Sequence, residues 1–60
     1  MPTGFFIVEY NKDGKGREVF ECNTAREGRE VLQDMRETRP GTCAILCDRE
    51  DGNRIIAEIE

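Results

Sequence analysis

The stretch TAREGREVLQDMRETRPG, which is Thr24–Gly41, decides the fold because it specifies both ends of a single helix. Thr24 is a good N-cap, and Glu27 three residues later completes a capping box, a specific signal for a helix start. Pro40 cannot continue a helix and keeps the residue before it out of the helical region, so the helix ends near Thr38. We therefore expect one helix between Thr24 and Thr38, with different structure on either side.

One side of this helix is apolar. At about 100° per residue, its apolar positions fall on a single face. That face consists of Ala25, Gly28, Val31, Leu32 and Met35. A glycine inside a helix costs up to ~1 kcal/mol relative to alanine. Gly28 on the apolar face therefore predicts a close approach between the helix and the surface on which it packs.

Two segments before the helix have the character of β-strands. Thr3–Tyr10 is rich in aromatic and β-branched residues, and Arg17–Cys22 alternates polar and apolar residues. Between them, Asn11–Gly16 (NKDGKG) contains the Asn, Asp and Gly residues that turns favour. The three segments together predict a β-hairpin.

Two segments after the helix, Thr42–Asp48 and Arg54–Glu60, predict a second hairpin, with Asp51-Gly52 as a two-residue type I′ turn. The fold class is therefore α+β: a single ββαββ domain over residues 1–60, with a four-stranded, mainly antiparallel sheet and the helix packed on one face. We expect the strand order 2-1-3-4. A parallel contact between the first and fourth strands is the main alternative.

The second hairpin can be sorted into two faces, because side chains of a strand alternate. The Asp51-Gly52 turn places Cys47 opposite Ile56. It also places Leu46 opposite Ala57. The face predicted to meet the helix carries Ala44, Leu46, Ile55, Ala57 and Ile59. The outer face carries Cys43, Ile45, Cys47, Ile56, Glu58 and Glu60.

The first hairpin allows two registers. A three-residue loop, Lys12–Gly14, with its glycine at the positive-φ bulge position, places Phe6 opposite Phe20. It also pairs Glu9 with Arg17. The residues facing the helix are then Phe6, Val8, Tyr10, Phe20 and Cys22.

A plain two-residue turn at Asp13-Gly14 is the alternative, and it changes every pair in the hairpin. It places Val8 opposite Val19 and shifts Ile7 to face Phe20. We prefer the three-residue loop, because it pairs opposite charges and gathers the aromatic side chains in the core.

On the preferred registers the outer face of the sheet remains apolar, although a solvated antiparallel face is mainly polar. Contiguous exposed apolar residues usually mark an interaction surface, and a chain of 60 residues gains from burying a second face. The face is therefore predicted to bind a protein partner, or a second copy in a homodimer. The predicted partner-binding residues are Phe5, Ile7, Val19, Ile45 and Ile56.

The charge and composition of the chain exclude several function classes. The net charge of −4 argues against direct nucleic-acid binding, which needs a basic surface, and disfavours anionic membranes. No apolar run approaches the ~20 residues of a membrane span, and the N-terminus shows no signal peptide. The chain has no histidine and no serine, so we predict no catalytic residue, cofactor or metal site.

The three cysteines favour free thiols and a cytoplasmic location, because secreted disulfide frameworks usually have an even number. Cys43 and Cys47 lie in one predicted strand, about 13 Å apart, whereas a disulfide needs Cα atoms within about 7 Å. We interpret both as small apolar packing residues. Cys22, just before the helix start, is the one candidate for a reactive thiol.

The exposed side of the helix carries a row of carboxylates: Glu27, Glu30, Asp34 and Glu37. The favoured hypothesis is a small, acidic, non-enzymatic module that binds a protein through its open sheet. An acidic regulator or inhibitor, docking this row onto a basic nucleic-acid-binding surface of a target protein, is the alternative. A cysteine-based enzyme or redox protein is the least favoured.

Overall fold

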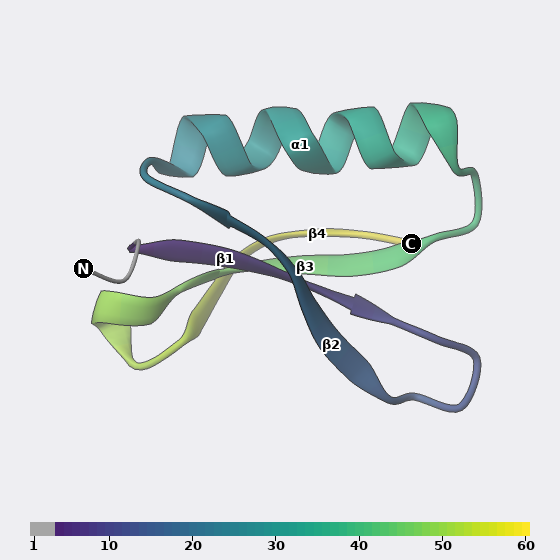
Figure 1. The fold of residues 1–60 in the computed structure, drawn as a ribbon, viewed down its shortest axis with the longest axis horizontal. Helices are drawn as coiled ribbons and strands as arrows, with labels where there is room; N and C mark the ends of the chain where they lie inside the picture. The colour runs from purple at the N-terminus through teal and green to yellow at the C-terminus, as the bar shows by residue number, and fades with distance from the viewer. Residues whose placement is uncertain (1–3) are drawn as a thin grey trace.

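The computed structural model describes residues 4–60, and its elements confirm the expected ββαββ order (Figure 1). They are β1 (Phe5–Tyr10), β2 (Gly16–Cys22), α1 (Ala25–Thr38), β3 (Cys43–Asp48), the short 3₁₀ helix η1 (Arg49–Asp51) and β4 (Arg54–Ile59). The predicted first strand began at Thr3, which lies outside the described residues. The helix η1 was not predicted.

The four strands form one sheet in the order β2-β1-β3-β4, and every neighbouring pair is antiparallel. This confirms the preferred arrangement. The parallel contact between the first and fourth strands is wrong, because β3 lies between β1 and β4. Helix α1 covers one face of the sheet, and within residues 4–60 no α-helix covers the other (Figure 1). No helix in this part of the chain is long and apolar enough to cross a membrane.

Helix α1 begins and ends where the sequence predicts. The Thr24 side chain accepts a hydrogen bond from the Glu27 amide at 3.1 Å, as an N-cap does. At the other end, the Arg39 amide donates to the Met35 carbonyl at 2.8 Å, and Gly41 takes the positive φ of 90° that turns the chain toward β3. Both ends thus satisfy backbone groups that a helix leaves free.

The apolar face of α1 packs on the sheet as predicted, with Gly28, Leu32 and Met35 buried. A Cβ atom on Gly28 would lie 2.5 Å from Leu46 Cδ1 and 3.0 Å from Cys22 Sγ. The close approach expected from this glycine is therefore confirmed. The central core between helix and sheet consists of Ile7, Cys22, Leu32, Met35, Ala44 and Leu46.

The first hairpin contains parts of both candidate registers. The Lys12–Gly14 loop forms as preferred, with Gly14 at φ 80°, and Glu9 lies opposite Arg17. A β-bulge at Val19 then shifts the register by one residue, so that Phe20 lies opposite Ile7 instead of Phe6. The predicted pairing of Phe6 with Phe20 is wrong.

The bulge and the pairing of β1 with β3 invert the predicted faces of β1. Ile7 lies opposite both Phe20 and Leu46, and it is fully buried in the helix-facing core. Phe5 also packs against this core. The residues between and after them in β1 were predicted to face the helix, but they point to the opposite side: Phe6, Val8 and Tyr10. Phe20 and Cys22 remain on the helix side, since they pair with Ile7 and Phe5.

The second hairpin differs from the prediction at its turn. The chain makes η1, capped by the Asp48 side chain, and then passes through Gly52 and Asn53, both with positive φ. Leu46 still lies opposite Ala57, as expected, but a bulge places Cys47 opposite Ile55. The predicted Asp51-Gly52 type I′ turn and the pairing of Cys47 with Ile56 are therefore wrong.

The two bulges lie on the two edge strands, β2 and β4. Each turns an extra apolar side chain toward the helix side, where Val19 and Ile56 pack against the core. Ile55, predicted to face the helix, is instead 55% exposed. A bulge twists an edge strand and interrupts its row of free backbone groups, which disfavours pairing with another chain.

Candidate functional site

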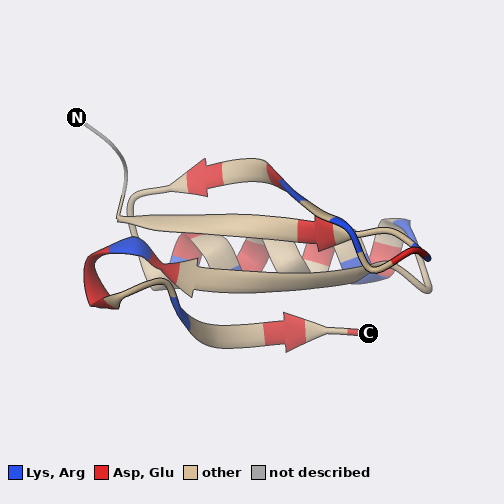
Figure 2. Ribbon diagram, turned by 90° about the horizontal axis from the view of Figure 1, so that it is seen from below, with Lys and Arg blue, Asp and Glu red and all other residues tan. Residues whose placement is uncertain are grey.

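The candidate site is the open face, the side of the sheet turned away from α1. Side-chain alternation and the strand pairings place on it Phe6, Val8, Tyr10, Glu18, Glu21, Cys43, Ile45, Cys47, Ile55 and Glu58. Figure 2 views the sheet from this side, with α1 behind it, and shows the middle of the central strands free of charged residues. The open face is thus apolar in its centre.

Cross-strand pairing arranges the open face in three rows. The first contains Glu21, Phe6, Cys47 and Ile55, and the second contains Glu18, Val8, Ile45 and Glu58. The third contains Gly16, Tyr10 and Cys43. The second row, which we call the central row, therefore has an apolar pair in its middle and a carboxylate on each edge strand.

The apolar residues of this face differ in exposure. Ile55 is 55% and Tyr10 38% exposed, and Val8 and Ile45 are half-buried. Phe6 and Cys47 are buried. Glycine at position 16 gives the Tyr10 ring its place, because a Cβ there would lie 2.7 Å from Tyr10 Cε1. The accessible apolar surface thus runs diagonally from Tyr10, through Val8 and Ile45, to Ile55.

Arg49 covers one part of the open face. Its backbone amide donates to the Gly4 carbonyl at 2.8 Å, which fixes the start of η1 beside β1. The guanidinium carbon lies 4.5 Å from the centre of the Phe6 ring, and Nη2 contacts Glu18 Oε1 at 3.1 Å. Its Nε is buried without a hydrogen-bond partner. Arg49 therefore shields Phe6 from solvent and holds the Glu18 carboxylate above the β2 side of the sheet.

Of the predicted partner-binding residues, Ile45 lies on the open face as expected. The placement of the other four on the outer face is wrong. Ile7 is fully buried against the helix, and the rest are half-buried and pack against the same core: Phe5, Val19 and Ile56. The physical reason differs between the strands. The bulges turn Val19 and Ile56 toward the helix, and in β1 the pairing with β3 turns Phe5 and Ile7 toward the helix.

Four open-face residues were missed as candidates: Val8, Tyr10, Ile55 and Arg49. The run Phe5–Val8 is apolar throughout, so it has no alternation from which its inward side could be read. A bulge next to Ile55 leaves no signature in the residue types around it. Nothing in the sequence pointed to Arg49, because its position depends on η1.

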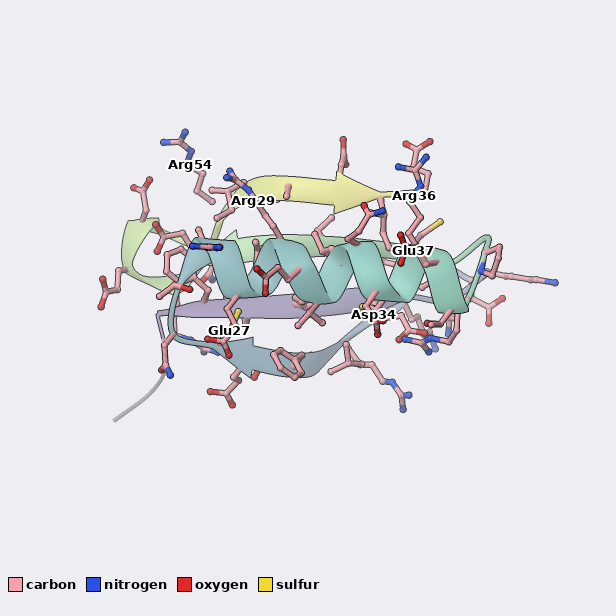
Figure 3. All side chains as sticks on the ribbon, turned by 90° about the horizontal axis from the view of Figure 1, so that it is seen from above. Glu27, Arg29, Asp34, Arg36, Glu37 and Arg54 are labelled. Carbon is pink, nitrogen blue, oxygen red and sulfur yellow. The ribbon has the colours of Figure 1, made fainter. Side chains whose placement is uncertain are left out.

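The acidic row of the helix is exposed, as its angular position predicted: Glu27, Glu30, Asp34 and Glu37. Figure 3 shows Glu27 and Asp34 on the side of α1 toward β2, and Arg29 and Arg36 on the side toward β4. Arg26 contacts Glu30 at 3.5 Å, with both side chains largely exposed. The Gln33 amide donates to Glu37 at 3.1 Å. Both charge signs thus share the solvent side of α1.

The three cysteines are free thiols. Cys22 is buried on the helix side, Cys47 is buried on the open side, and Cys43 is exposed. Burial raises the pKa of the Cys22 thiol, and the nearby Glu27 carboxylate raises it further. Burial also raises the pKa of Cys47. Both buried thiols therefore form thiolate less readily than an ordinary cysteine, which makes them poor nucleophiles.

Within residues 4–60, no group of three or more Cys, Asp or Glu side chains is arranged to hold a metal ion.

Comparison of the chain with protein-family models, with curated proteins and with solved structures finds no match in any of the three.

Proposed function

We propose that the protein is a small, acidic, non-enzymatic module of the reducing cytoplasm that binds another protein, or a second copy of itself, through its open face. The observation that supports this most is the apolar surface from Tyr10 to Ile55, on a face that no α-helix of residues 4–60 covers. Contiguous exposed apolar surface of this kind marks interaction sites in soluble proteins.

The shape of the sheet favours its face over its edges as the binding surface. Partners that add a strand need a regular edge with free N–H and C=O groups. Both edge strands, β2 and β4, carry a bulge in the middle of their pairing. A partner that packs onto the pleated surface of β1 and β3 meets no such irregularity.

The acidic side of α1 has less support as a docking surface. Its carboxylates are exposed, and two of them are already engaged, Glu30 with Arg26 and Glu37 with Gln33. Exposed charges of this kind contribute little binding free energy without an apolar contact beside them. The acidic-regulator hypothesis therefore remains the second choice.

Site-specific photo-crosslinking tests the proposal. A photoreactive phenylalanine derivative replaces Ile55, which is exposed enough to take it without disturbing the core. The matched control carries the same group at Glu30, whose side chain is 70% exposed on the opposite side of the molecule. Both variants are irradiated in an extract of the source cells.

We expect a discrete protein adduct at position 55 that is absent at position 30 and does not form when excess unlabelled wild-type chain is present during irradiation. An adduct of the chain with itself fits the homodimer form of the proposal. Adducts at position 30 alone contradict the proposal and favour the acidic helix instead. No adduct at either position also contradicts it.

A further inference from the structure

We propose that the occupant of the open face is a different protein rather than a second copy, and that it carries basic side chains on both sides of an apolar contact. This inference rests on the proposed function and adds the chemistry of the partner. The inference is argued from the central row, because strand pairing fixes the positions of its charged and apolar residues.

The central row has a defined spacing. Val8 and Ile45 lie opposite each other on the two inner strands, Glu18 flanks them on β2, and Glu58 flanks them on β4. Since neighbouring strands lie about 4.8 Å apart, the two carboxylate-bearing backbones are about 14 Å apart. A complementary surface therefore places an apolar side chain over the inner pair and a cation over each edge.

A second copy of the chain does not meet this requirement. Two sheets that pack face to face usually keep their strands within about 30° of each other. When the two sheets overlap fully, a two-fold axis places β4 of one copy over either β4 or β2 of the other. On this face β4 carries Glu58, whereas β2 carries Glu18 and Glu21. Full overlap of the two sheets thus brings Glu58 of one copy near Glu58 or Glu18 of the other, which is unfavourable in a desolvated interface.

Arg49 already offsets the Glu18 carboxylate. It contacts Glu18 at 3.1 Å and lies over Phe6. Glu58 lies at the opposite edge, three strands away. The β4 side of the central row is therefore the part of the open face where a partner's cation gains most.

Two matched peptides serve as probes. One is a designed helical peptide with a leucine stripe flanked on both sides by lysine, and the other has glutamate at every lysine position. Each is titrated into the ¹⁵N-labelled full chain at low and at high salt, and amide chemical shifts report where it binds. A dilution series of the chain alone reports self-association by the same signals.

We expect the lysine peptide to shift amides of Val8, Ile45 and Glu58, more weakly at high salt, and the glutamate peptide to shift none of them. Glu58→Gln should weaken the lysine peptide about two- to fivefold, the range for an exposed ion pair, and the matched Glu30→Gln should leave it unchanged.

Other outcomes overturn the inference in distinguishable ways. Equal binding of both peptides to the open face leaves the proposed function standing and contradicts a basic partner. Concentration-dependent shifts of the chain alone at Val8 and Ile45 identify a second copy as the occupant. Shifts confined to α1, or no shifts with either peptide, contradict the docking face itself.

Discussion

Arg49 shows how one side chain can decide the accessibility of a surface. Its guanidinium covers the Phe6 ring at 4.5 Å and reaches Glu18 on the far strand of the hairpin. A cation over an aromatic face contributes about 0.5–1 kcal/mol at an exposed site, and an exposed ion pair about as much. The buried Nε without a partner offsets part of this gain.

Arg49→Ala should therefore lower the free energy of unfolding by about 1 kcal/mol and expose the Phe6 ring. The control is Arg26→Ala, which removes an ion pair whose arginine is 90% exposed and should change stability by less than about 0.5 kcal/mol. Urea unfolding followed by circular dichroism measures both. Equal losses in the two variants would show that Arg49 is an ordinary surface arginine.

The buried thiols predict a pH dependence of stability. The pKa of Cys22 and of Cys47 is raised in the folded chain, so that the folded state keeps these protons longer than the unfolded state. Below the ordinary thiol pKa of about 8.5 both states are protonated, and nothing changes. Above it the unfolded state ionises first, and the free energy of unfolding falls as pH rises toward the folded-state pKa.

The urea midpoint should thus fall as the pH rises above about 8.5, and fall less in a variant with Cys22→Ala and Cys47→Ala. Exposed Cys43 should react with a thiol reagent at once, whereas the other two react only as the chain unfolds. Identical pH dependence in the variant and the wild type would refute this explanation.

At the scale of elements, the packing of α1 on β3 depends on a glycine. Alanine at position 28 would gain up to ~1 kcal/mol of helix propensity, but its Cβ would lie 2.5 Å from a Leu46 side chain that is fully buried. Overpacking in a core usually costs about 1–3 kcal/mol. Gly28→Ala should therefore lower the melting temperature, and a higher one would mean that α1 is free to move away from the sheet.

The bulge in β2 predicts the result of a deletion. Without Val19, Glu18 still lies opposite Val8 and Phe20 still lies opposite Ile7, so the faces of the hairpin are preserved. We expect this variant to fold, to lose about 1 kcal/mol of burial energy, and to self-associate more, because its edge strand becomes regular.

Deletion of Glu21 is the matched control. It would move Cys22 from the buried helix side to a position opposite Phe6 on the open face. Cooperative unfolding should therefore be lost. Cross-strand NOEs between Phe20 and Ile7 check the pairing in the Val19 deletion, and their absence there would show that the bulge does not set the register.

Much of the element scale could be predicted from the sequence. The Thr24 N-cap, the Pro40-Gly41 stop and the Lys12–Gly14 loop are local signals, and each formed as expected. Two predicted pairings also formed. Glu9 pairs with Arg17 between the loop and the bulge of β2, and Leu46 pairs with Ala57 beyond the bulge of β4.

The candidate site was harder to predict, because a shift of one residue moves every side chain of a strand to the other face. The bulges turn Val19 and Ile56 toward the core, and no local sequence signal marks either of them. In the uniformly apolar Phe5–Val8 run, the pairing with β3 decides which side chains face the helix. Of the predicted partner-binding residues, only Ile45 therefore lies on the open face.

At the scale of the whole molecule, one helix and one sheet make a single apolar core on one side of β1 and β3. A chain of 60 residues has little stability to spare, so a change on the core side and a change on the open side should have very different results. Ile7→Asp would bury a carboxylate among apolar side chains at a position with no exposed surface. It should abolish cooperative unfolding.

Ile45→Asp should instead keep a cooperative transition, with a loss of about 1–2 kcal/mol, because Ile45 lies half-buried on the open face, where a carboxylate can reach water. Thermal unfolding followed by circular dichroism separates the two variants. If both unfold alike, the open face is a second core surface and cannot be a free docking site.

The measurement that tests the docking role of the open face most directly is competition by Ile45→Asp for the adduct formed at position 55. Excess wild-type chain present during irradiation should suppress formation of that adduct, and the folded variant should fail to suppress it, because a charge at the centre of the face cannot be buried unpaired. A folded Ile45→Asp chain that competes as well as the wild type would contradict the proposal that the open face binds the partner.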